Sequence, residues 1–116
     1  MADEAILICA SDALEEGGKG VRFPLPSPES RPATGFAVRF DGEARAFVNR
    51  CPHLGVELDW QPGEFFEGTG LYLVCSTHGA LFEPASGFCF AGPCRGASLE
   101  RVDIAEQGGR IVLVTR

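Results

Sequence analysis

Two short cysteine–histidine pairs are the residues of this chain with the clearest chemistry. The first pair is Cys51 and His53 in the run C-P-H, and the second is Cys75 and His78 in the run C-S-T-H. Together they offer two thiolate sulfurs and two imidazole nitrogens, a donor set that suits a [2Fe–2S] cluster in which two histidines replace two cysteines on one iron. Because imidazole is neutral, such a cluster accepts an electron more readily than an all-cysteine cluster. The predicted chemistry is one-electron transfer.

A structural zinc site is the alternative use of the same four residues, because cysteine and histidine also bind zinc in tetrahedral sites. Zinc fingers usually pair like ligands within each arm, whereas each arm here is mixed. They also stabilise domains that are too small to have a core of their own. Purified protein that is colourless and contains zinc would establish this alternative.

The length and composition are those of one folded domain. The chain has 116 residues, of which 45% are hydrophobic, enough for one core but too short for a carrier and a separate catalytic domain. We therefore expect a single domain over residues 1–116. The five cysteines are odd in number and irregularly spaced, which does not indicate a disulfide scaffold. Without a secretory signal or a membrane span in the sequence, we expect a cytoplasmic protein with reduced cysteines.

The formal net charge of −6 at pH 7 bears on possible partners. Nucleic-acid binding requires basic patches, so we expect no nucleic-acid partner. The same negative charge would steer the protein towards a basic face on a redox partner. Solubility alone also accounts for a mildly acidic chain, so both explanations stay open.

Strand-like segments dominate the sequence, and no long segment has helical periodicity. Strands are predicted at 5–9, 21–23, 36–40, 44–49, 71–74, 81–82, 88–90, 99–104 and 110–114. The first of these is wholly apolar and is expected to be buried. The dipeptide at 41–42, Asp-Gly, favours a tight hairpin turn. Many short strands separated by turn residues predict an all-β fold, either a sandwich or a barrel.

Two connecting segments complete this prediction. One helical turn is expected within 11–16, with Ser11 or Asp12 as its N-cap. The proline-rich stretch 24–35 is expected to be a surface loop. The run 57–59, Glu-Leu-Asp, is expected to be a solvated face without a role at the site.

Three further cysteines, Cys9, Cys89 and Cys94, are expected to be small buried residues rather than ligands. Cys89 and Cys94 lie five positions apart in the chain, so a bridge between them is a second option. Buried apolar packing remains the favoured prediction for all three.

The chain resembles the Rieske ferredoxin family in three segments. They are N-R-C-P-H-L-G at 49–55, V-C-S-T-H-G-A-L-F at 74–82, and A-G-P-C-R-G-A-S-L at 91–99, the last similar to the family's proline loop. The resemblance implies stacked antiparallel sheets, with a small cluster-binding subdomain over about 50–95 formed by two ligand loops. It also implies one [2Fe–2S] cluster, with Cys51 and Cys75 on the inner iron and His53 and His78 on the outer iron.

Three departures from the respiratory branch of that family bear on function. The respiratory branch joins its two ligand loops by a disulfide, but Val56 and Thr77 stand at those positions here. It also has a serine and a tyrosine whose hydroxyl groups donate to cluster sulfurs, where this chain has Ala80 and Phe82. Without these donors, negative charge on the sulfurs is less stabilised. The resemblance therefore implies a reduction potential low in the Rieske range, at about −150 mV.

The resemblance further implies a soluble electron carrier, not itself an enzyme and a monomer when isolated. It would take electrons from a flavin-dependent reductase and pass them singly to a terminal oxygenase. One alternative is a tightly bound small subunit, similar to that of bacterial nitrite reductase, and another is a redox-responsive binding module. The segment between the two ligand pairs, which contains Phe65 and Phe66, is longer than is usual in dioxygenase ferredoxins, so the subfamily stays open.

Overall fold

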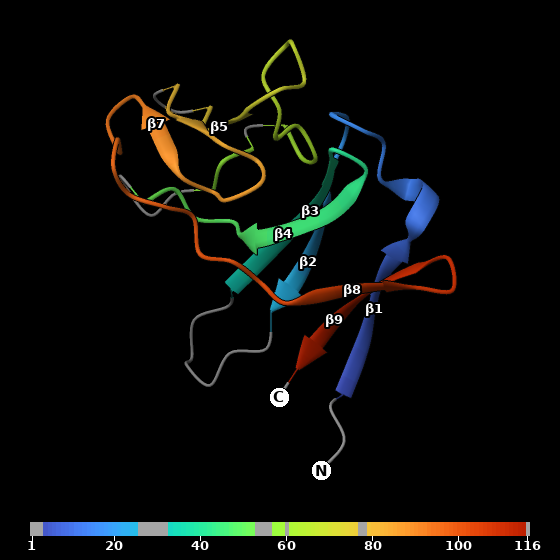
Figure 1. The fold of residues 1–116 in the computed structure, drawn as a ribbon. Coiled ribbons are helices and arrows are strands. Elements are labelled where there is room, and N and C mark those ends of the chain that lie inside the picture. Colours follow the sequence, from blue (N-terminus) through green and yellow to red (C-terminus); the bar gives the residue numbers. More distant parts are fainter. Residues whose placement is uncertain (1–3, 26–32, 53–56, 60, 77–78, 116) are drawn as a thin grey trace.

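The computed structural model describes residues 4–25, 33–52, 57–59, 61–76 and 79–115 (Figure 1). The described strands are β1 (Glu4–Ala10), β2 (Val21–Leu25), β3 (Ala33–Phe40), β4 (Glu43–Val48), β5 (Leu73–Val74), β6 (Leu81–Phe82), β7 (Cys89–Ala91), β8 (Ile104–Gln107) and β9 (Arg110–Thr115). They form three antiparallel sheets of three strands each, in the orders β1-β9-β8, β2-β3-β4 and β5-β6-β7. The predicted all-β fold is confirmed. None of the described segments is a helix long and apolar enough to cross a membrane.

The three sheets are arranged one after another along the molecule. The sheet β1-β9-β8 carries both chain ends, and the small sheet β5-β6-β7 lies at the opposite end with its connecting loops (Figure 1). The sheet β2-β3-β4 lies between them. Cys75, which directly follows β5, therefore lies at the end of the fold that carries the small sheet.

The hairpin between β3 and β4 follows the sequence prediction. Its turn is Asp41-Gly42, and both residues have positive φ, of 56° and 76°. A two-residue turn with both residues in this region matches the right-handed twist of the flanking strands. Pairing runs from Phe40 with Glu43 to Gly35 with Val48.

Aromatic residues form the centre of the core under the small sheet. The rings of Phe36 and Phe65 stack with centroids 4.0 Å apart, and Phe47 packs against Phe36 at 5.9 Å in a tilted arrangement. All three side chains are buried. The long segment before the second ligand pair thus contributes Phe65 to the core, which explains how the fold accommodates its extra length.

The first strand differs from the prediction of a buried segment. Ile6 and Leu7 are 47% and 60% exposed, because β1 is the edge strand of its sheet and its register with β9 shifts between Leu7 and Cys9. An apolar run alone does not distinguish a buried central strand from an exposed edge strand.

Several element boundaries also differ from the prediction. The helical turn is a short 3-10 helix at Ser11–Ala13, which begins after Ala10 without a side-chain cap. The predicted loop 24–35 is shorter, since β2 extends to Leu25 and β3 begins at Ala33. Strand β8 begins at Ile104 rather than at residue 99, because the preceding segment hydrogen-bonds to β4 through Val102 N–H and Ala46 C=O at 3.0 Å.

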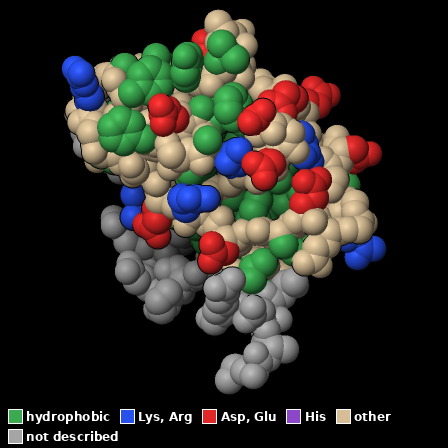
Figure 2. Space-filling view, viewed as in Figure 1, with side chains coloured by type: hydrophobic (Ala, Val, Ile, Leu, Met, Phe, Trp, Pro, Cys, Tyr) green, Lys and Arg blue, Asp and Glu red, His purple; other side chains and the backbone are tan. Residues whose placement is uncertain are grey.

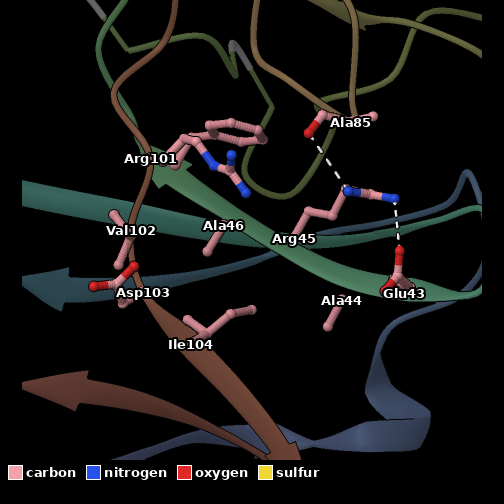
Figure 3. Close-up of a pocket in the computed structure, with 10 residues that line it drawn as sticks. Glu43, Ala44, Arg45, Ala46, Ala85, Arg101, Val102, Asp103 and Ile104 are labelled. Carbon is pink, nitrogen blue, oxygen red and sulfur yellow. Dashed lines mark hydrogen bonds and ion pairs between the residues drawn. The ribbon is translucent and has the colours of Figure 1, made fainter.

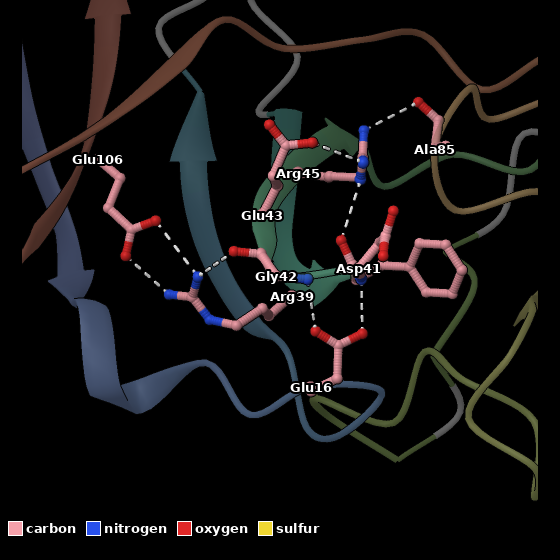
Figure 4. Close-up of polar contacts among 9 residues, drawn as sticks. Glu16, Arg39, Asp41, Gly42, Glu43, Arg45, Ala85 and Glu106 are labelled. Carbon is pink, nitrogen blue, oxygen red and sulfur yellow. Dashed lines mark hydrogen bonds and ion pairs between the residues drawn. The ribbon is translucent and has the colours of Figure 1, made fainter.

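One arginine connects the sheets near the 3-10 helix (Figure 4). The guanidinium of Arg39 on β3 donates to both carboxylate oxygens of Glu106 on β8, at 3.2 and 2.8 Å. It also donates to the carbonyl oxygens of Leu14 and Ser11, at 2.9 and 3.0 Å. In the same region, the carboxylate of Glu16 accepts the N–H groups of Asp41 and Gly42 in the β3–β4 turn, at 2.6 and 2.8 Å. These contacts fix the β3–β4 turn against the N-terminal segment.

The same carboxylates predict an acid-sensitive stability. Backbone hydrogen bonds from Gly42 and Asp41 lower the pKa of Glu16, and the hydrogen bond from Arg39 lowers the pKa of Glu106. Both carboxyl groups have a lower pKa in the folded protein than in the unfolded chain. The two carboxylates therefore stabilise the fold above the unfolded pKa of about 4.3, and this stabilisation is lost as pH falls through the folded pKa. The unfolding free energy of the wild type should fall between pH 7 and pH 3. We expect it to fall less in Glu16→Gln and in Glu106→Gln, as measured by urea denaturation. Glu100→Gln, at an exposed position, is the control, and a slope unchanged in all three variants would contradict this explanation.

Candidate metal centre

Two of the four predicted ligands lie together in the core. Cys51 and Cys75 are 2% and 1% exposed, and they belong to the same cluster of buried residues as Ala80. Cys51 follows β4, and Cys75 directly follows β5. The other two predicted ligands, His53 and His78, lie outside the described residues. The structure thus places the two predicted sulfur donors in one buried cluster.

Backbone hydrogen bonds join the described residues on the two sides of the second ligand loop. The N–H of Cys75 donates to Ala80 C=O at 2.9 Å, and the N–H of Gly79 donates to Cys75 C=O at 2.8 Å. Gly79 has a φ of 71°, whereas a β-carbon at this position would meet no atom within 4 Å. Glycine is therefore favoured here by its backbone conformation and not by lack of space.

A buried polar network closes the base of the first ligand loop. The side-chain oxygen of Asn49 accepts the N–H of Leu58 at 2.8 Å, and its side-chain nitrogen donates to Asp59 at 2.9 Å. The other carboxylate oxygen of Asp59 accepts the N–H of Gly63 at 3.0 Å. Residues before and after the loop are thus joined through two buried side chains.

The expectation that 57–59 is a solvated face is therefore wrong for two of its three residues. Leu58 is fully buried and Asp59 is 6% exposed, while Glu57 is exposed and forms an ion pair with Arg22 at 2.6 Å. The charge of Asp59 favoured an exposed position, but the carboxylate is buried because it accepts hydrogen bonds from Asn49 and Gly63. The sequence signal for burial was an apolar residue, Leu58, between two acidic residues directly after a ligand loop.

The two ligand loops are in direct contact through their backbones. The N–H of Ser76, the residue after Cys75, donates to Leu58 C=O at 3.0 Å. Leu58 thereby connects the base of the first loop with the second. Backbone hydrogen bonds and packing link the loops at this point, as expected for a chain without cysteines at the bridging positions.

A third segment packs against the second ligand loop. Gly92 has a φ of 94°, and a β-carbon there would lie only 2.7 Å from the Cα of Ala80. Only glycine allows this close approach. The segment 92–96, which we call the covering loop, is therefore seated directly beside the ligand turn.

Two more thiols lie in the same core as the predicted ligands. Cys89 on β7 and Cys94 in the covering loop are 0% and 5% exposed, so the prediction of buried residues is confirmed for both. Burial raises the pKa of the Cys94 thiol to about 12, and its hydrogen bond with Cys89 is the next cause. Cys94 is therefore a neutral thiol at pH 7. Cys9, in contrast, is only partly buried.

The residues present fit an iron–sulfur cluster. Cluster irons are bound by cysteine thiolates, and the two buried sulfurs lie on loops that are joined at their base and covered by a close-packed third loop. Zinc fingers are small domains that depend on their metal for a core, whereas this chain has a large aromatic core. Among the described residues, no group of three or more Cys, His, Asp or Glu forms a metal site by itself.

A groove on the described surface is lined by other residues than these cysteines. It has a volume of about 220 Å³ and lies between β4 and the segment that leads into β8 (Figure 3). Arg45 on its wall donates to Glu43 at 3.0 Å and to Ala85 C=O at 3.4 Å. None of its described lining residues is a cysteine, so we do not assign the groove to the metal centre.

Comparison with known proteins agrees with this geometry. The chain matches the model of the Rieske [2Fe–2S] domain family over residues 5–106. A search of curated protein sequences gives no significant match.

Solved structures show the same fold at low sequence identity. The Sphingomonas yanoikuyae B1 ferredoxin is 19% identical, with a TM-score of 0.69, and the match covers 97% of this chain and 99% of that one. The ferredoxin of carbazole 1,9a-dioxygenase from Nocardioides aromaticivorans IC177 is 20% identical, with a TM-score of 0.70, covering 97% and 98%. The terminal oxygenase of the same Nocardioides system is 15% identical, with a TM-score of 0.75.

The two kinds of structural relative differ in length. The match covers 97% of this chain but only 30% of the Nocardioides oxygenase, and 28% of an oxygenase chain found in complex with a ferredoxin. The chain therefore spans less than a third of the oxygenases and nearly the whole of the ferredoxins. With a family match across most of its length and two buried cysteines on joined loops, the chain belongs to the Rieske [2Fe–2S] domain family, whose domain binds one Rieske-type [2Fe–2S] cluster.

Proposed function

We propose that this protein is a Rieske-type ferredoxin, a one-electron carrier in the cytoplasm that works with separate redox enzymes. The observation that carries the proposal is the pair of buried thiols, Cys51 and Cys75, on two directly joined loops of a Rieske domain. We assign them as the sulfur ligands and His53 and His78 as the nitrogen ligands. When bound, the cluster supplies a reversible one-electron redox couple.

The surrounding residues give the ligands a dry and ordered setting. Ala80 and Phe82 are 1% and 0% exposed and bring no hydroxyl group to the site. The aromatic core belongs to the same buried cluster as both cysteines, and the Asn49–Asp59 network orders the loop base. Without hydroxyl groups at positions 80 and 82, the extra negative charge of the reduced cluster is less stabilised, which supports a potential of about −150 mV, at the low end of the Rieske range.

A terminal oxygenase is the proposed electron acceptor, and a flavin-dependent reductase the proposed donor. Support comes from the ferredoxin-like length of the match and from solved relatives in which a ferredoxin is in complex with the oxygenase of carbazole 1,9a-dioxygenase. Hydrophobic side chains gather at the end of the molecule that carries β5–β7, with acidic side chains around them (Figure 2). Leu71, Tyr72 and Phe88 in this region are exposed. With a net charge of −6, such a surface suits brief contact with a basic partner face.

Anaerobic stopped-flow mixing tests this function directly. Chemically reduced protein is mixed with an oxidised Rieske terminal oxygenase, and we expect electron transfer whose second-order rate falls as salt is raised. A monomeric elution volume should accompany it. Absence of transfer to any such oxygenase would contradict the carrier role, and a partner complex that survives high salt would favour a permanent subunit instead.

The missing hydroxyl at position 80 gives a second, independent test. If Ala80→Ser places a donor next to the cluster sulfurs, a hydrogen bond contributing about 1 kcal/mol to the reduced state would raise the potential by about 40 mV. Protein-film voltammetry measures this shift. Ala85→Ser, at an exposed position, should leave the potential unchanged. An equal potential in wild type and Ala80→Ser would contradict our explanation of the low value.

A further inference from the structure

Two thiols outside the ligand set lie unusually close to each other. The sulfur atoms of Cys94 and Cys89 are 2.8 Å apart, with Cys94 donating to Cys89. Even two carbon atoms in optimal contact are about 3.5–4.0 Å apart, while a disulfide bond is about 2.05 Å long. Both residues are free cysteines in the structure. The two sulfurs are therefore positioned between ordinary contact and a covalent bond.

The backbone around the pair holds this arrangement in place. Cys89 N–H donates to Ala97 C=O at 2.8 Å, and Gly96 N–H donates to Cys89 C=O at 2.9 Å. On the other side, Ala97 N–H donates to Cys94 C=O at 2.9 Å. These bonds close the loop independently of the side chains. The entropy cost of bringing the two sulfurs together is thus already met in the folded thiol form.

We propose that Cys89 and Cys94 are a redox modification site, at which an intrachain disulfide forms by exchange with a low-molecular-weight disulfide such as oxidised glutathione. Two S–H bonds and the S–S bond of the reagent break, and one protein S–S bond and two reagent S–H bonds form. The protein loses two electrons and two protons, and the reagent gains them. Because both thiols are buried, exchange requires transient opening of the covering loop and is slow.

Formation of this bond would fix the covering loop beside the cluster. Cys94 belongs to that loop, and Gly92 in the same loop lies against Ala80 of the second ligand turn. Exposed neighbours, including Pro93 and Arg95, face solvent and give a small reagent a route when the loop opens. The disulfide therefore fastens the covering loop to β7 and slows its opening away from the ligand turn.

Mass spectrometry of the cluster-loaded protein tests the site. The protein is equilibrated anaerobically with mixtures of reduced and oxidised glutathione, quenched in acid to stop exchange, alkylated and digested. We expect a mass lower by two hydrogens and a linked Cys89–Cys94 peptide. Cys9→Ser, which removes the partly buried cysteine on β1, should show the same linkage, whereas Cys89→Ser should lose it. Alkylation of both thiols at every glutathione ratio, or a link from Cys94 to Cys51 instead, would overturn the proposal.

Release of iron to a chelator tests the fastening effect separately. We expect it to be several-fold slower after glutathione oxidation in wild type and in Cys9→Ser, and unaffected by oxidation in Cys89→Ser. Equal release rates for the dithiol and disulfide forms would overturn the effect on the covering loop. Neither the mass nor the release rate depends on an electron acceptor. Both measurements therefore test the disulfide even if the protein proves not to be an electron carrier.

Discussion

Replacing Cys75 by alanine is expected to abolish stable cluster binding while the β fold persists. The thiol is 1% exposed, and its removal takes away one of only two sulfur ligands that we assign. The turn that holds the residue is closed by backbone hydrogen bonds with Ala80 and Gly79, which alanine retains. Deleting one buried heavy atom costs about 1 kcal/mol of packing, less than the total stability of a domain, at about 5–15 kcal/mol.

Iron content, visible absorption and far-ultraviolet circular dichroism measure the outcome. Cys75→Ala should lack iron and colour but keep the β spectrum, and Cys51→Ala should behave in the same way. Cys9→Ala is the matched control, because Cys9 lies on β1 in a different sheet and core cluster and its loss should leave the iron content unchanged. A Cys75→Ala variant with the wild-type visible spectrum would show that the ligand assignment is wrong.

Asp59→Ala is expected to lower the unfolding free energy by about 2–5 kcal/mol, because two buried donors lose their acceptor. Those donors are the side-chain nitrogen of Asn49 and the N–H of Gly63. The side chain of Asp59 is fully buried, so water cannot replace it without opening the loop base. Because Leu58 in this network also binds the second ligand loop, the cluster should dissociate faster as well. Urea denaturation and the rate of visible bleaching measure the two effects.

The neighbouring acidic residue supplies a control of the same charge. Glu57 forms an exposed ion pair with Arg22, and such pairs contribute about 0–1 kcal/mol, so Glu57→Ala should change little. Asp59→Asn keeps one acceptor oxygen and should fall between wild type and Asp59→Ala. Equal stabilities for Glu57→Ala and Asp59→Ala would show that the buried network does not support the ligand loops.

Local chemistry made the type of cluster and the hairpin predictable. The Asp41-Gly42 dipeptide favours positive φ at both positions and so defined the turn between β3 and β4. The mixed pairs containing Cys51 and Cys75 indicated cluster chemistry because few other sites use such donors. Alternating and apolar runs identified most strands, since they depend on the near neighbours of each residue.

Features that depend on distant parts of the chain were not predictable in this way. The exposure of Leu7 follows from the edge position of β1, which is set by pairing with β9 at the other end of the chain. The burial of Asp59 depends on Asn49 across the ligand loop. The five-residue spacing of Cys89 and Cys94 made a contact between them an option, but the hydrogen-bonded path of the covering loop decides it. Spacing in the sequence alone does not determine these three-dimensional relationships.

The most direct test of the central claim is nitrogen coupling to the reduced cluster. The chain contains two histidines, His53 and His78, so isotopically labelled histidine marks only these residues, and electron–nuclear double resonance can detect their nitrogens at the iron. We predict strong hyperfine coupling from both labelled imidazoles in the reduced protein. A reduced cluster without histidine nitrogen coupling, or a purified protein that contains zinc in place of iron and sulfide, would contradict the account.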